Sequence, residues 1–157
     1  MTEAEDLALK LVSEGERLHG QLNDLNAGDW EVAIYTEGSV WTVRSILAHL
    51  VTAERAFVRL FDGMRQGGSG VSDDFEIDRY NARQQEKMRD VSAGDLLRQF
   101  QAVRMAMVSL VRGLTDADLD RQGRHPFLGV ASLREMIKMI YIHDQTHYRD
   151  VRRALKG

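Results

Sequence analysis

Two histidines lie four residues apart near the end of the chain, in the segment YIHDQTHYRD. The segment has helical periodicity, so His143 and His147 lie one turn apart on the same side of a helix. They share a predicted apolar stripe with Met136, Ile140 and Ala154. A buried imidazole without a partner costs about 1–3 kcal/mol. The spacing therefore indicates either two hydrogen-bonded core histidines or half of a transition-metal site.

A third histidine, His49, lies in the middle of an earlier amphipathic segment, VWTVRSILAHLVTAERAF. Helical projection places it beside Ala53 on the flank of the apolar face, where it would point toward a neighbouring helix. Alone, such a residue is typical of the boundary between core and solvent. Together with the later pair it would provide three neutral nitrogen ligands and an open coordination position, as in catalytic zinc and related sites. We therefore take His49, His143 and His147 as the candidate metal ligands.

Three charged residues are candidates for orienting these imidazoles through their second ring nitrogens, as groups behind a metal ligand commonly do. Glu54 follows His49 by five residues, Asp144 is next to His143, and Arg104 interrupts the apolar stripe of its own helix. Glu54 and Asp144 have a simpler alternative as solvated charges on a helix surface. For Arg104 the alternative is a side chain that reaches solvent along the helix, or one that pairs with either carboxylate.

The remaining histidines are assigned to ordinary surface roles, His19 at the solvent edge of the first helix and His125 in a loop before Pro126. Several aromatic residues fall around the predicted loops between helices: Trp30, Tyr35, Trp41 and Phe127. We expect them to pack the ends of the helices, with the wall of a substrate pocket as the alternative.

The composition limits the chemistry. The 157 residues include no cysteine, so any metal must be held by nitrogen and oxygen. The acidic, amphipathic N-terminus does not resemble a secretory signal, and no apolar run approaches the roughly 20 residues that span a bilayer. We expect a cytoplasmic protein without a membrane partner. The formal net charge of -3 argues against nucleic-acid binding, and the basic C-terminus is interpreted as the favourable end of a helix dipole.

Helical periodicity and caps predict an all-α protein with a single domain over residues 1–157. Four amphipathic helices are expected, at Glu3–Asn26, Thr42–Gln66, Ser92 to about Leu114, and Ser132–Leu155, with a short additional helix at Asp78–Arg89. Four such helices pack most simply as a four-helix bundle. The long connection between the second and third helices allows them to run parallel by crossing over the bundle, which gives an up-down-down-up order.

Several segments together resemble those of a known family. They are WTVR at residues 41–44 leading into LAHL at residues 47–50, Glu54 after these, and HDxxH at residues 143–147. YNARQ at residues 80–84 and LTDADL at residues 114–119 also match common segments. Their order and spacing resemble the DinB/YfiT-like superfamily of metalloenzymes over nearly the whole chain.

The resemblance implies an up-down-down-up four-helix bundle, often a homodimer, with a divalent metal, zinc or nickel, bound by three histidines. Carried over to this sequence, these ligands are His49, His143 and His147. Some relatives are S-transferases or isomerases that use a low-molecular-weight thiol such as mycothiol, bacillithiol or glutathione. The thiol is therefore a second cofactor that the resemblance suggests.

Three functions follow as alternatives. The first is a metal-dependent enzyme, either a thiol-dependent S-transferase or a hydrolase, that acts on a small electrophilic substrate. The second is a non-catalytic stress or resistance protein that binds a small hydrophobic molecule inside the bundle. The third is a structural or regulatory interaction module without a metal.

Overall fold

Four long helices make up most of the computed structural model, which describes residues 1–157. They are α1 (Glu3–Asn23), α2 (Val43–Arg65), α4 (Ala93–Arg112) and α6 (Leu133–Lys156). Each follows a threonine or serine whose side chain accepts a hydrogen bond from the backbone N–H three residues later. The mainly helical fold predicted from the sequence is thus confirmed. None of these helices combines the length and apolar character that crossing a membrane requires.

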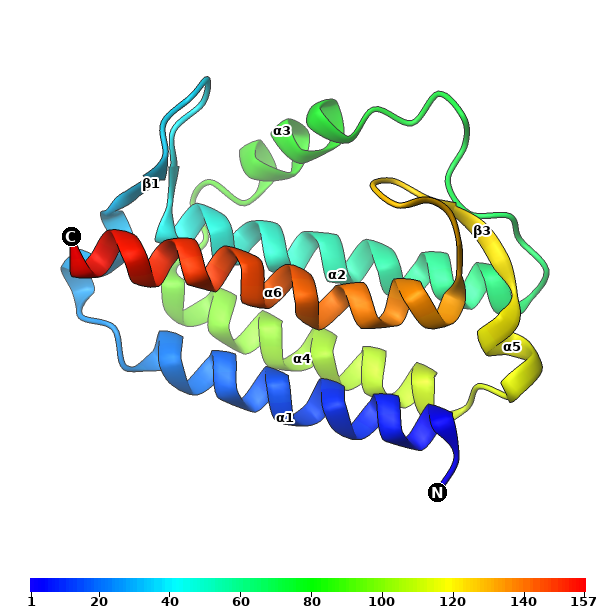
Figure 1. Ribbon diagram of the computed structural model, residues 1–157. Helices are drawn as coiled ribbons and strands as arrows, with labels where there is room; N and C mark the ends of the chain where they lie inside the picture. Colours follow the sequence, from blue (N-terminus) through cyan, green and yellow to red (C-terminus); the bar gives the residue numbers. More distant parts are fainter.

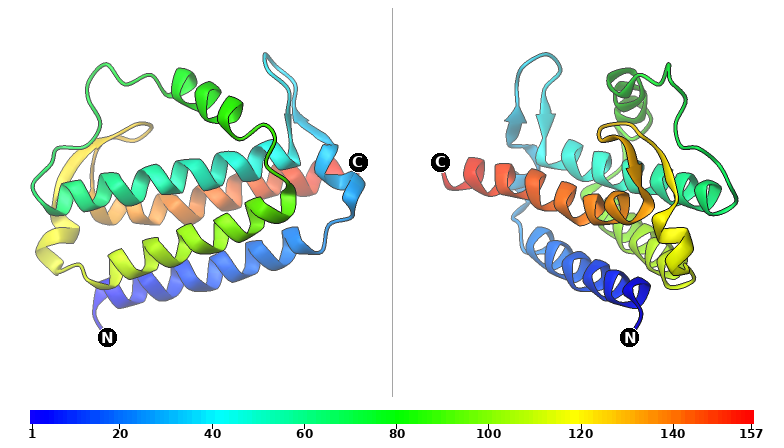
Figure 2. Two further views of the ribbon diagram at one scale, coloured as in Figure 1. Left: turned by 180° about the vertical axis from the view of Figure 1, so that it is seen from behind. Right: turned by 45° about the vertical axis from the view of Figure 1, so that its right-hand side comes forward.

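The four helices pack with α4 against both α1 and α2, and with α6 against the same two helices. In Figure 1, α1 and α6 run toward the left of the view, whereas α2 and α4 run toward the right. Figure 2 shows the same arrangement from behind, with α1 and α4 side by side. Because α2 and α6 run in opposite directions, the middle of one helix lies beside the middle of the other.

The connection between α2 and α4 contains the short helix α3 (Ile77–Lys87), close to its predicted position. No residue of α3 is buried, and hydrogen bonds attach α3 to α2. After α3, the connection also packs on the core through Met88, which is buried in the same cluster as Leu47 of α2. Gln85 donates to the backbone carbonyl of Ser45 at 2.8 Å. Arg44 donates to the carbonyls of Met88 and Val91, both at 3.2 Å. The connection is thereby fixed over α2 (Figure 1).

Two short β-hairpins and two short helical segments were not predicted from the sequence. The hairpins pair β1 (Ala33–Tyr35) with β2 (Trp41–Thr42) and β3 (Gln122–His125) with β4 (Gly129–Ser132). Strands this short cannot show a clear alternation of apolar and polar residues, so the expectation of an all-α chain missed them. The helical segments are η1 (Ala27–Glu31) and α5 (Asp116–Asp120). α1 ends before the predicted Asn26 because that residue is extended and precedes η1.

The core is divided into two apolar clusters by a polar layer in the middle of the bundle. One cluster contains Leu11, Phe61 and Met107, and the other contains Leu47 and Phe100. The layer between them has one residue from each long helix, in the order α1, α2, α4 and α6: Gly15, Glu54, Arg104 and Asp144. Its three polar members are all buried.

The buried face of α6 is rotated relative to the predicted stripe. Its central residues are Ile140, Asp144 and Val151, all buried, whereas Ala154 is exposed. His143 and His147 are half-buried on the flank of this face rather than at its centre. The rotation turns the two imidazoles toward the seam between α2 and α6, and it turns the Asp144 carboxylate into the core.

Candidate metal centre

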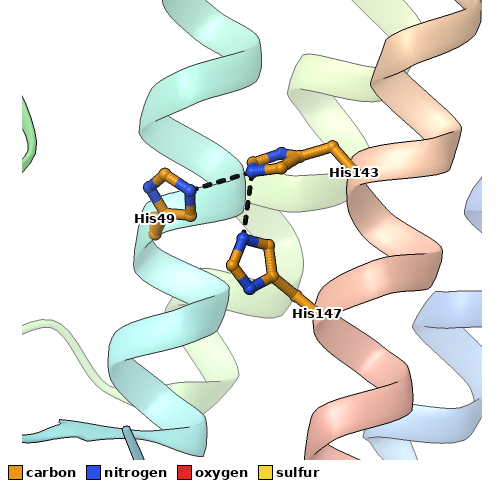
Figure 3. A group of neighbouring side chains, drawn as sticks. All are labelled: His49, His143 and His147. Atoms are coloured by element: carbon orange, nitrogen blue, oxygen red, sulfur yellow. Dashed lines mark hydrogen bonds between the residues drawn. The ribbon is translucent and has the colours of Figure 1, made fainter. Parts of the chain in front are cut away.

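The three histidines singled out from the sequence converge in the seam between α2 and α6 (Figure 3). His49 projects from α2, and His143 and His147 project from successive turns of α6. The Nε2 atom of His143 lies 3.1 Å from Nε2 of His49 and 3.0 Å from Nε2 of His147. One ring nitrogen from each residue lies within 4.8 Å of the other two. Residues 94 positions apart in sequence thus form one cluster.

Two of the three separations have the size expected of ligands to one ion. Two nitrogens that each lie about 2.1 Å from the same metal are about 3.0–3.4 Å apart at octahedral to tetrahedral angles. The two short Nε2–Nε2 distances, 3.0 and 3.1 Å, fall in that range. The arrangement could therefore hold one metal ion between α2 and α6.

The three imidazoles are held neutral by their surroundings. Burial, followed by the neighbouring His143 and His147, lowers the pKa of His49 to about 2. Burial, followed by the charge of His147, lowers the pKa of His143 to about 3. Burial also lowers the pKa of His147, against the opposing effect of Asp150. Neutral imidazoles carry the lone pairs that metal coordination needs.

The tautomer of His147 is set by Tyr35 and Asp150. The Tyr35 hydroxyl lies 2.6 Å from Oδ2 of Asp150 and 2.9 Å from Nδ1 of His147. A carboxylate can only accept, so the hydroxyl donates its proton to Asp150 and its oxygen accepts from the Nδ1–H of His147. The Nε2 atom of His147 is then unprotonated and faces the other two histidines. The raised pKa of Tyr35, caused by burial and then by Asp150, keeps the hydroxyl protonated.

With this tautomer, the two contacts at Nε2 of His143 cannot both be hydrogen bonds in the metal-free cluster. Only one hydrogen can lie on Nε2 of His143, and it can satisfy the contact with His147. The contact with His49 then has no N–H donor of its own, because a second proton there would point at the first. A cation at the centre would satisfy all three lone pairs at once.

The hairpin β1–β2 supports both sides of the cluster. Tyr35 on β1 contacts His147 edge-on, with 5.8 Å between ring centroids. Trp41 on β2 lies against His49, with 5.1 Å between centroids. The two aromatic rings also contact each other. Tyr35 and Trp41 therefore contact the histidine cluster. The sequence did not indicate this contact, because strands as short as β1 and β2 do not predict a hairpin.

The three charged candidates hydrogen-bond one another and not the histidines: Glu54, Arg104 and Asp144. Arg104 donates to both carboxylate oxygens of Glu54 at 2.8 Å, and it also donates to Asp144. Neither carboxylate hydrogen-bonds an imidazole, so the expected orienting role through the ring nitrogens is not observed. The alternative of solvated surface charges is wrong as well, since both carboxylates are buried. The pairing of Arg104 with a carboxylate, which the sequence left open, is what the structure contains.

The Arg104 cluster is closed. The guanidinium also donates to the Leu11 backbone carbonyl at 3.0 Å. A Cβ atom at Gly15 would lie 2.9 Å from an Arg104 nitrogen, so only glycine leaves room at that point of α1. Burial raises the pKa of Asp144, although Arg104 opposes the shift. The cluster thus contains its own cation, the Arg104 guanidinium.

The two remaining histidines lie outside the three-histidine cluster. His19 is half-buried on α1. The predicted surface role of His125 is wrong, because this residue is buried at the end of β3 and its ring stacks on Phe57 of α2 at 4.9 Å and 11°. Backbone N–H groups of the turn after His125 donate to its Nδ1 atom. The sequence shows only that Pro126 follows His125, which predicts a turn but not this contact.

One cleft in the structure is separate from the three-histidine cluster. It has a volume of about 540 Å³ and lies between α1 and α6. Its α6 residues include Gln145, Arg149 and Arg152, which point away from the side of the helix that carries His143 and His147. The histidine cluster therefore lies at the seam of α2 and α6, outside this cleft.

Fold and site together define a helical-bundle protein with a candidate three-histidine metal centre. The sequence profile of the DinB superfamily matches residues 10–151, and the chain belongs to this superfamily. The resemblance inferred from the sequence motifs is thereby confirmed. No curated protein matches the chain.

Solved structures share the fold at low sequence identity. YfiT from Bacillus subtilis, described as a probable metal-dependent hydrolase with an unusual four-helix bundle topology, is similar with a TM-score of 0.79 and 15% identity, over 99% of this chain and 89% of that one. An uncharacterised Escherichia coli UTI89 protein has a TM-score of 0.76 and 16% identity, over 98% and 92% of the two chains. A mycothiol-dependent maleylpyruvate isomerase also has a TM-score of 0.76, at 14% identity, but this chain covers only 61% of its length.

Proposed function

We propose that the chain is a metal-dependent enzyme whose divalent metal is held by Nε2 of His49, His143 and His147. One observation carries the proposal: three neutral imidazole nitrogens converge within 4.8 Å, and protons alone cannot satisfy their contacts. We place this site in a bundle of up-down-down-up order, with the long crossover through α3.

The residues of the site have distinct roles in this proposal. The three imidazoles hold the ion, the Tyr35 hydroxyl fixes the His147 tautomer, and Trp41 packs against His49. Three ligands leave a coordination position free, and a divalent cation supplies Lewis acidity that lowers the pKa of a bound water or thiol toward neutrality. Zinc and nickel both suit imidazole ligands.

The proposed reaction is attack on a small electrophilic molecule by a low-molecular-weight thiol or by water. The thiol-dependent transfer is supported by the similarity to a mycothiol-dependent isomerase, and the hydrolysis by the similarity to a probable metal-dependent hydrolase. The two differ only in the nucleophile, so the same protein preparation can be tested for both.

Metal binding is the first test. Protein purified without a nickel column should contain, or take up, one zinc or nickel ion per chain, measured by elemental analysis and calorimetric titration. Alanine at any one of His49, His143 or His147 should abolish stoichiometric binding. His19→Ala is the matched control, since His19 lies outside the cluster, and it should bind as the unaltered protein does. Binding that survives His143→Ala would overturn the proposed ligand set.

Activity is the second test. The metal-loaded protein is assayed with 1-chloro-2,4-dinitrobenzene and a panel of thiols, and separately with p-nitrophenyl esters without a thiol. Turnover in either assay that disappears in the His143→Ala variant supports an enzyme and identifies the nucleophile. If neither assay shows turnover, and the variants keep their affinity for a small hydrophobic molecule, the non-catalytic binding protein replaces the enzyme.

We also propose that the chain forms a homodimer, as the family resemblance implies. Sedimentation equilibrium with and without metal gives the mass directly. A monomer at all concentrations would remove this part of the proposal without affecting the metal site.

A further inference from the structure

His125 has one ring nitrogen committed to the protein and one left free. Its Nδ1 atom accepts hydrogen bonds from the backbone N–H groups of Phe127 at 3.0 Å and Leu128 at 3.1 Å. A nitrogen that accepts cannot carry the proton of a neutral imidazole, so the proton lies on Nε2. Burial lowers the pKa of His125 to about 4, which keeps this neutral form at pH 7.

The free N–H reaches accessible space. No protein group hydrogen-bonds Nε2 of His125, yet no fully buried polar side-chain atom in the structure lacks a partner. This nitrogen must therefore touch solvent, although the residue is only 5% exposed. The ring cannot turn away, because it is stacked on Phe57 and held by two backbone donors.

His125 lies on the same side of the bundle as the candidate metal centre. Figure 1 shows the hairpins β1–β2 and β3–β4 rising from one side of the α2–α6 pair. The first hairpin contacts His49 and His147, and Phe57, under His125, lies on α2 two turns beyond His49. His125 stacks on Phe57, which follows His49 by eight residues on α2, so its ring lies about 12 Å along the helix from His49.

The geometry points to His125 as a substrate-binding residue, whose fixed Nε2–H donates a hydrogen bond to a carbonyl or carboxylate oxygen of the molecule that occupies the metal centre. This inference rests on the proposed function and adds a substrate class to it. The substrate would carry an oxygen acceptor on the side of its reacting group that faces the β3–β4 hairpin.

Two substitutions separate this role from the turn that His125 stabilises. In His125→Asn the amide oxygen can replace Nδ1 as acceptor for the turn, but no N–H remains in the position of Nε2. In His125→Gln an amide N–H can replace Nε2–H, but the acceptor for the turn is lost. A purely structural histidine would be better replaced by asparagine, whereas a substrate donor would be better replaced by glutamine.

The experiment uses acetate as the probe of a carboxylate oxygen, titrated into the zinc-loaded protein. Affinity is measured by calorimetry, and the Nε2–H resonance of His125 is followed by ¹⁵N NMR. We expect acetate to shift this resonance, and His125→Asn to bind acetate about 10–100-fold more weakly, the range for a lost hydrogen bond to a charged group. His125→Gln should keep the affinity within a few fold, but unfold about 2–4 °C lower because its turn is weakened.

The outcomes distinguish failure of the His125 inference from failure of the proposed metal centre. If all variants bind zinc and His125→Asn binds acetate as well as the unaltered protein, the inference is wrong and the metal centre stands. If the unaltered protein does not bind zinc, the proposed function fails and the inference fails with it. His19→Asn should change neither affinity.

Discussion

The middle of the bundle contains two polar clusters built largely from the same two helices. α2 contributes His49 to one and Glu54 to the other, and α6 contributes the adjacent residues His143 and Asp144. In the Arg104 cluster, two carboxylates surround a guanidinium that belongs to the protein. In the histidine cluster, three neutral rings surround a point at which the protein places no positive charge.

The difference shows how a structural polar cluster can be told from a functional one. The Arg104 cluster is complete, because its donors and acceptors satisfy one another and Gly15 closes the remaining space. The histidine cluster is incomplete, because the single proton that Nε2 of His143 can carry satisfies only one of its two contacts at about 3 Å. A cluster whose donors and acceptors are all paired fixes how the helices pack, whereas a cluster with unpaired lone pairs needs a ligand. Four predictions test this contrast.

Removal of the internal cation should have the largest effect. Arg104→Met leaves two buried carboxylates without a partner and should lower the free energy of unfolding by about 3–5 kcal/mol, measured by urea denaturation. Replacing all three charged residues, with Arg104→Met, Glu54→Leu and Asp144→Leu, should restore most of that loss. If Arg104→Met alone is as stable as the unaltered protein, the cluster is not the closed structural unit described above.

Acid should destabilise the metal-free protein through the histidines. The pKa of His49 is lowered to about 2 in the folded state, so below about pH 6.5 the unfolded chain takes up a proton that the folded chain does not. The stability associated with this residue is present above pH 6.5 and lost as the pH falls, by about 2 kcal/mol between pH 7 and pH 5. Unfolding at both pH values, compared with His49→Gln, isolates the effect. An equal pH dependence in the variant would contradict it.

Loss of the Tyr35 hydroxyl should weaken metal binding without removing a ligand. Tyr35→Phe leaves the Nδ1–H of His147 without its acceptor and should reduce metal affinity about 10–100-fold. Calorimetric titration with zinc measures the change, and Tyr148→Phe is the control, since the Tyr148 hydroxyl makes no hydrogen bond to the cluster. Unchanged affinity in Tyr35→Phe would mean that the tautomer of His147 is set by other means.

A methyl group at Gly15 should have a smaller effect, confined to stability. Gly15→Ala places Cβ 2.9 Å from Nη1 of the Arg104 guanidinium, a group that donates to three other residues, and should cost about 1 kcal/mol net of the helix propensity gained. Gly20→Ala on the same helix meets no atom within 4 Å and should instead stabilise by about 0.5–1 kcal/mol. Equal changes in the two variants would show that Arg104 can move aside.

The helices and the candidate ligands could be predicted because their signals are local. The caps at Thr2, Thr42, Ser92 and Ser132 lie within four residues of the groups they bind. The spacing of His143 and His147 is a property of one helix. The identity of their partners is not local, since Tyr35 lies 112 residues from His147 and sits on a strand of three residues. Arg104 likewise meets Glu54 and Asp144 across 50 and 40 residues.

By itself, the sequence determined where four helices begin and that three histidines occupy helical positions able to meet. The tertiary structure decided which polar group meets which. A rotation of α6 by about one residue, or about 100°, exchanges the imidazoles of His143 and His147 with the Asp144 carboxylate. The packing of all four helices fixes that rotation, because the whole core must fill at once, and no local pattern along the chain records it.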